Sequence, residues 1–168
     1  MNGILMQNTL LKRVEAQVES QVPPAVRENY MKIVVSGMKY AMKDGANSII
    51  ASLKQSKDPL GDSVKGAINI VGLLRKAAKG TMPVNAMIPA AMTLLLQALD
   101  FADKTGILKV GQAEVDKATK MFMETILPLL NVPPEKMNAM MQQVHDLMRD
   151  PAKMAQLKEQ QSGSAQLG

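Results

Sequence analysis

The sequence contains no cysteine, no tryptophan and only one histidine, His145, among its 168 residues. A chain without cysteine has no disulfide framework, thiolate chemistry, iron–sulfur cluster or usual structural zinc site. We interpret the single imidazole as a surface or interface group rather than a catalytic one. Phosphate-binding glycine loops, nucleophile elbows and zinc-protease motifs are also missing from the sequence. We therefore expect a protein that is not an enzyme, with no cofactor and no metal site.

Carboxylate pairs are present, and each could be considered for acid–base chemistry. They are Asp100 with Asp103, Glu114 with Asp116, and Asp146 with Asp150. All three pairs fall near predicted helix ends or on polar faces, so solvation or charge pairing explains them better than catalysis.

Aromatic side chains are nearly as scarce, since two tyrosines and two phenylalanines make up 2% of the chain. Leucine, isoleucine, valine, alanine and 15 methionines must therefore fill the core. Such a composition favours closely packed helices over a β-sandwich, and no alternating strand pattern is present. We predict an all-α fold, a compact bundle of about six to eight short helices. A single domain is expected at 1–161, followed by a small polar tail at 162–168.

Proline, aspartate and glycine mark the expected helix boundaries. Asp58 and Pro59 form a typical start, an N-cap followed by a residue that needs no N–H donor. Gly45, Gly80 and Gly106 suit the left-handed position that follows a helix. These signals predict helices at about 5–21, 24–44, 46–56, 62–79, 86–105, 111–131, 134–149 and 151–161.

Basic residues exceed acidic ones, and the net charge is +5. This excess suits an acidic partner such as nucleic acid or an anionic lipid surface, although a solvated helix face is the ordinary alternative. No DNA-reading motif is present and few aromatic rings are available for stacking, so only non-specific DNA contact is supported. The candidate phosphate-contacting residues are Lys32, Lys39, Lys43, Arg75, Lys76 and Lys79.

An uncharged run occupies residues 80–99, about the length that a helix needs to cross a bilayer. Its proline and polar residues favour a buried core helix over a constitutive span, while membrane insertion after a trigger stays an alternative. With the apolar segment at 67–74, the run predicts a central helical hairpin with small residues at the crossing. We predict contacts with a second copy or a membrane through Ile68, Val71, Gly72, Leu73, Ala90, Ala91, Leu94 and Leu95.

Methionine recurs at helical spacing in two places. One stripe contains Met31, Val34, Val35, Met38 and Met42. The other is predicted to be a face for a partner helix and contains Met137, Met140, Met141, Val144 and Met148. Flexible thioether side chains suit surfaces that pack in more than one arrangement, whereas core filling is the ordinary alternative. A copper(I) site is a weak alternative without cysteine.

In amino-acid composition and in the position of its apolar segment, the chain over residues 5–161 resembles the small internal or ejection proteins of tailed bacteriophages. The resemblance lies in a basic helical chain that is rich in methionine and alanine, lacks cysteine and tryptophan, and has an apolar middle. It implies a self-assembling, non-enzymatic virion protein that acts with other virion proteins to deliver the genome across the host envelope. The residues themselves leave two alternatives open: a cytoplasmic helical adaptor or regulator, and a basic DNA-associated protein.

Overall fold

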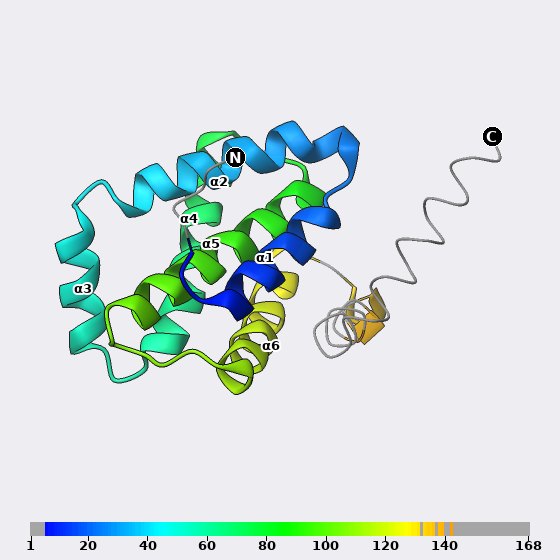
Figure 1. Ribbon diagram of the computed structural model, residues 1–168. Coiled ribbons are helices and arrows are strands. Elements are labelled where there is room, and N and C mark those ends of the chain that lie inside the picture. The colour runs from blue at the N-terminus through cyan, green and yellow to red at the C-terminus, as the bar shows by residue number, and fades with distance from the viewer. Residues whose placement is uncertain (1–5, 132, 137, 140–141, 143–168) are drawn as a thin grey trace. The chain divides into compact units, whose positions relative to one another are not determined.

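The computed structural model describes residues 6–131, 133–136, 138–139 and 142 (Figure 1). The chain divides into two units, Met1–Ile126 and Leu127–Gly168, and each is considered by itself. The described residues form helices and no strands, which confirms the predicted all-α fold. The predicted helix at 151–161 and the tail at 162–168 lie outside the described residues, as does the expected domain end.

The first unit is built from consecutive helices. They are α1 (Thr9–Ser20), the short 3-10 helix η1 (Pro24–Val26), α2 (Arg27–Ala41), α3 (Ala46–Gln55), α4 (Pro59–Ala77), α5 (Val84–Lys104) and α6 (Gln112–Leu129). The last residues of α6, from Leu127, belong by sequence to the second unit. The described residues of that unit from 134 onward are helical, and they fall within the helix predicted at 134–149.

The helix boundaries follow the predicted signals, with two corrections. Gly45, Gly80 and Gly106 adopt φ of +83°, +75° and +71° after the preceding helices, as predicted. The helix predicted at 62–79 already begins at Pro59, because an Asp58 carboxylate oxygen accepts a hydrogen bond from the Gly61 amide at 3.0 Å. The helix predicted at 24–44 begins as the 3-10 turn η1, and α2 ends at Ala41.

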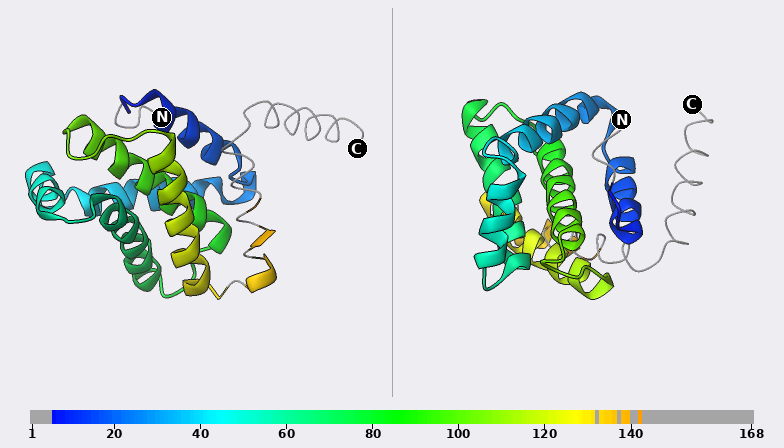
Figure 2. Two further views of the ribbon diagram at one scale, coloured as in Figure 1. Left: turned by 90° about the horizontal axis from the view of Figure 1, so that it is seen from below. Right: turned by 60° about the vertical axis from the view of Figure 1, so that its left-hand side comes forward.

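Helix α5 lies at the centre of the first unit and packs against α1, α2 and α4. Figure 2 shows it between α4 on one side and α1 on the other. Helices α4 and α5 form the predicted apolar hairpin. Gly37 permits the close approach of α2, because a Cβ atom there would lie 2.5 Å from a methyl carbon of Leu94. A buried hydrogen bond of 2.9 Å joins the Tyr30 and Thr93 hydroxyls across the same contact.

In the part of the chain that the structure describes, α5 is the one helix long and apolar enough to cross a membrane. Of its most apolar 18-residue window, 61% is buried among the other helices. An apolar helix covered in this way has the setting of a core helix, which is the arrangement that the sequence favoured.

Candidate functional site

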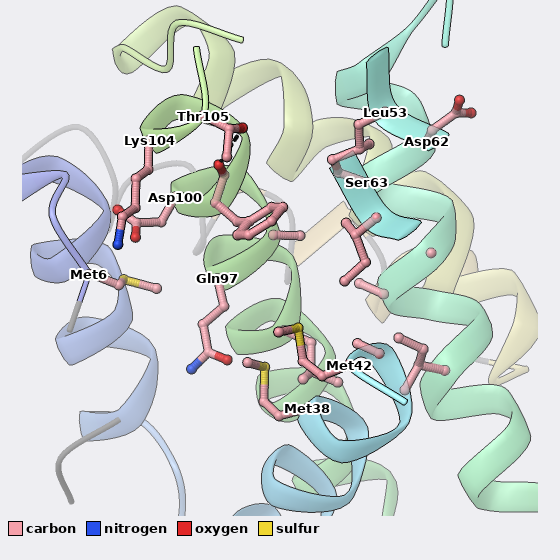
Figure 3. Close-up of a pocket in the computed structure, with 18 residues that line it drawn as sticks. Met6, Met38, Met42, Leu53, Asp62, Ser63, Gln97, Asp100, Lys104 and Thr105 are labelled. Atoms are coloured by element: carbon pink, nitrogen blue, oxygen red, sulfur yellow. Dashed lines mark hydrogen bonds between the residues drawn. The ribbon is translucent and has the colours of Figure 1, made fainter. Parts of the chain in front are cut away.

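An apolar cleft of about 450 Å³ lies along α5 in the first unit (Figure 3). Helix α5 and its C-terminal end form one side, while residues of α2, α3 and α4 form the others. We call it the α5 cleft. Its lining includes Met6, Met38, Met42, Gly66, Gln97 and Phe101.

Three methionines line the cleft. Met38 and Met42 come from the stripe that the sequence placed on α2, and Met6 joins them from the segment before α1. Met42 is 38% exposed, so the cleft opens to solvent at this edge. Flexible side chains at an open edge allow the cleft to adapt to its occupant.

Gly66 leaves open space on the α4 side of the cleft. A Cβ atom built at this position would meet no heavy atom within 4 Å. A larger side chain at residue 66 would therefore enter the cleft without disturbing the packing of α4 against α5. Gly72, on the same helix, is exposed and equally unobstructed, but it does not line the cleft.

The Gln97 side chain is one of the polar groups that line the cleft. Its amide nitrogen donates a hydrogen bond of 3.0 Å to a carboxylate oxygen of Glu15 in α1. Its amide oxygen is buried and has no hydrogen-bond partner among the described residues. Figure 3 shows this oxygen on the side of Met38 and Met42, and the nitrogen on the opposite side.

Burial raises the pKa of the Glu15 carboxyl, and the carboxylates of Glu19 and Asp100 raise it further. The hydrogen bond from Gln97 acts in the opposite direction. The native chain therefore binds a proton at residue 15 more readily than the unfolded chain does.

This difference predicts a pH dependence of stability. Because the native pKa of Glu15 is raised, the free energy of unfolding should fall as pH rises above about 4.3, the ordinary glutamate value. The Glu15→Gln variant should lose this part of the slope, because its neutral amide can still accept the bond from Gln97. Urea unfolding at a series of pH values measures the effect. Glu124→Gln, at an exposed position of α6, is the control, and equal slopes in all three proteins would contradict the prediction.

The Asp100 and Asp103 carboxylates hold the segment before α1 against the end of α5. An Asp100 oxygen accepts hydrogen bonds from the Gln7 and Asn8 amides at 3.0 and 2.8 Å. Asp103 accepts from the Asn8 side chain at 3.0 Å and from the Val110 amide at 2.9 Å. The sequence-based explanation, solvation or charge pairing, is wrong for this pair, because both carboxylates bind amide groups.

The other carboxylates have similar local partners. Glu114 accepts from the Gly111 amide at 2.9 Å, and Asp116 accepts from the Gln112 side chain at 2.9 Å. The Asp146 and Asp150 pair and His145 lie outside the described residues. Within residues that the structure describes, no group of three or more histidine, aspartate or glutamate side chains is arranged to hold a metal ion.

The residues predicted to contact a second copy or a membrane have two kinds of location. Six are buried inside the first unit, namely Ile68, Val71, Ala90, Ala91, Leu94 and Leu95, and Leu94 also borders the α5 cleft. Gly72 is exposed, and Leu73 is 46% exposed. Gly72 and Leu73 are accessible at the surface of α4, and Leu94 can be reached only through the α5 cleft. The predicted contact itself stays a prediction.

Three of the predicted phosphate-contacting residues are in or just after α2, and three are at the C-terminal end of α4 or just beyond it. Lys32 forms an ion pair with Glu28 and lines a smaller hollow of about 190 Å³ with Leu74 and Ala78. This places Lys32 near the C-terminal end of α4, where Arg75, Lys76 and Lys79 follow. Lys39 and Lys43 follow Met38 and Met42 directly in sequence but do not line the α5 cleft. The ammonium group of Lys43 lies 4.8 Å from the centre of the Tyr40 ring.

The second methionine face, Met137, Met140, Met141, Val144 and Met148, lies outside the described residues. Comparisons of the chain with protein-family models, with curated proteins and with solved structures find no match.

Proposed function

We propose that this chain is a non-enzymatic binding protein whose α5 cleft receives an apolar segment of a protein partner. The observation that carries the proposal is the cleft itself, about 450 Å³ of apolar space beside a central helix. Open apolar grooves between helices commonly hold the apolar face of an amphipathic segment. This proposal corresponds to the adaptor alternative from the sequence.

The charged side chains that line the cleft are Asp62, Asp100 and Lys104. Because both signs of charge are present, apolarity rather than charge would select the partner segment.

A self-assembling virion component is a second proposal. The phage-like composition supports it, and so does the exposed pair Gly72 and Leu73 on α4, since exposed apolar side chains can contribute to an interface. The partners would then be further copies of this chain and other virion proteins, with the host envelope and the delivered DNA as further contacts. Sedimentation of the purified chain separates the proposals: a large assembly favours the virion component, whereas a monomer or dimer favours the binding protein.

The Gly66→Leu variant tests the cleft directly. Its side chain would occupy the open space beside α4, so binding of an apolar anion should weaken by about tenfold. Replacing a glycine within a helix also favours the helix by up to about 1 kcal/mol, so unfolding would not explain the loss. The probe is 1-anilinonaphthalene-8-sulfonate, followed through the methyl NMR signals of the cleft methionines.

The matched control is Gly72→Leu, which makes the same change on the same helix outside the cleft. It should bind the probe as the wild-type chain does. Equal binding by the Gly66→Leu variant and the wild type would overturn the cleft as the binding site.

A further inference from the structure

We propose that residues 6–20, which comprise α1 and the short segment before it, form a lid that detaches from α5 as a unit and opens the α5 cleft beside Met6. We call these residues the α1 lid. The inference concerns how access to the cleft is controlled, so its use as a gate rests on the proposed binding function. Detachment itself can be measured without a ligand.

The α1 lid depends on one neighbour for most of its contacts. Helix α1 packs mainly against α5, and two of its side chains, Leu11 and Val14, are buried. Helices α2 and α4 pack against each other as well as against α5, so they hold one another in place when α1 leaves. Figure 2 shows α1 on the side of α5 opposite α4. A peripheral helix with few buried side chains is the kind of element that opens locally while the rest stays folded.

The start of the lid is tied to the end of α5 at the edge of the cleft. Asp100 accepts hydrogen bonds from the Gln7 and Asn8 amides, and Asp103 accepts one from the Asn8 side chain. Met6, which directly precedes these residues, is buried and lines the cleft, as Asp100 does (Figure 3). Detachment would therefore withdraw Met6 from the cleft wall and widen the cleft.

The middle of the lid carries a charge that its surroundings offset only in part. Glu15 is half-buried, and it forms no ion pair among the described residues. Its hydrogen bond from Gln97 is a bond to a neutral amide. Burial and the carboxylates of Glu19 and Asp100 disfavour the ionised form of Glu15, and detachment would return that carboxylate to water. Ionised Glu15 therefore favours the detached lid.

The start of α2 brings two further titratable groups to this part of the lid, Tyr30 and Arg27. Burial raises the pKa of the Tyr30 hydroxyl, and the hydrogen bond with Thr93 lowers it. The carboxylates of Glu19 and Glu15 raise this pKa further, and the Arg27 guanidinium opposes them. At about pH 8 the tyrosine is therefore neutral, and Glu15 is the charged group that passes from a half-buried setting into water when the lid detaches.

The test uses the absence of cysteine, because a single introduced thiol then reports on one position. Val14→Cys places the thiol under the lid, and Val71→Cys makes the same change in α4, where Val71 is 1% exposed. Both variants of the full chain are labelled with 5,5′-dithiobis(2-nitrobenzoic acid) at about pH 8. Local detachment should make the Val14→Cys variant react about tenfold faster or more, with a weaker urea dependence because less surface becomes exposed.

Two outcomes would overturn the lid. Equal labelling rates with equal urea dependence would show that residue 14 is reached only when the whole first unit unfolds. Labelling of the Val14→Cys variant that urea does not change would show that the reagent reaches residue 14 without detachment. Urea unfolding of each variant, followed by circular dichroism, corrects for the effect of the substitution on global stability.

Adding Glu15→Gln to the Val14→Cys variant tests the contribution of the charge. A neutral amide costs less to bury than a carboxylate, so labelling should slow severalfold. Glu124→Gln, at an exposed position of α6, is the control and should leave the labelling rate unchanged. Equal rates with and without Glu15→Gln would overturn the part assigned to Glu15.

The gate is tested with Val14→Ala, which weakens the lid at a buried residue outside the cleft lining. Because a larger fraction of the chain is then open, the affinity for 1-anilinonaphthalene-8-sulfonate should rise about fivefold to tenfold. Val71→Ala, also outside the lining, is the control and should leave the affinity unchanged. An unchanged affinity in the Val14→Ala variant overturns the gate but not the cleft. Equal probe binding by the Gly66→Leu variant and the wild type overturns the proposed function instead, and the labelling result stands.

Discussion

Replacing Ala91 with glutamate is expected to unfold the first unit. Ala91 is 0% exposed on α5, the helix that packs against α1, α2 and α4. The substitution would bury a charge and overfill a packed site, at a combined cost of roughly 4–5 kcal/mol. Small domains are stable by about 5–15 kcal/mol, so most of the folding free energy would be lost.

Far-ultraviolet circular dichroism and urea unfolding measure this effect. The control is Leu73→Glu, because Leu73 is 46% exposed and its replacement should change stability by no more than about 0.5 kcal/mol. A different result, intact helicity with a smaller solution mass, would place Ala91 at a contact between copies, as the sequence predicted.

The second large effect is expected from Asp100→Ala. The variant loses two hydrogen bonds from the Gln7 and Asn8 amides to a charged acceptor, each worth about 1.5–3 kcal/mol. Water can reach part of this segment and recover some of the loss, so we expect a destabilisation of about 2–3 kcal/mol.

The urea midpoint again provides the measurement, with Asp116→Ala as the control. The Asp116 carboxylate accepts from the exposed Gln112 side chain, and its loss should cost about 0.5 kcal/mol or less. If both variants unfold at the same urea concentration, the Asp100 carboxylate does not hold the segment before α1.

The local structure could be predicted from the sequence because its causes are local. The Asp58 carboxylate caps α4 by accepting a hydrogen bond from the Gly61 amide, three residues further along the chain. Gly80 follows the same helix in a left-handed backbone conformation. The central position of α5 was also predictable, since a helix without charge over residues 80–99 must be covered on most sides. Helix α4 begins at Pro59, three residues before the predicted start, directly after the Asp58 cap.

The candidate site could be predicted only in part. The methionine stripe of α2 was recognised, but nothing in the sequence indicated that Met38 and Met42 would line an open cleft while Val34 would be buried. Gln97 looked like a polar interruption of an apolar run. Its role depends on Glu15, which lies 82 positions away in the sequence, and a pairing at that distance leaves no local pattern.

The predicted contact residues show the same limit. Ala90, Ala91, Leu94 and Leu95 are all buried on α5, and an apolar residue in such a helix has the same sequence signature whether it faces a neighbouring helix or another molecule. Only the packing of α1, α2 and α4 around α5 shows that these residues face inward.

The hydrogen bond between the Asn8 amide and Asp100 also bears on the order in which the protein can fold during its synthesis. The two residues are 92 positions apart, and chains are synthesised at about 5–20 residues per second. Asn8 therefore precedes its acceptor by roughly 5–18 seconds. During this interval α2, α3 and α4 can form and pair, whereas α1 has no surface to dock on until α5 is complete. Helix α1 is thus made before α5 but docks only after it, and its apolar side, including Leu11 and Val14, stays uncovered for that time.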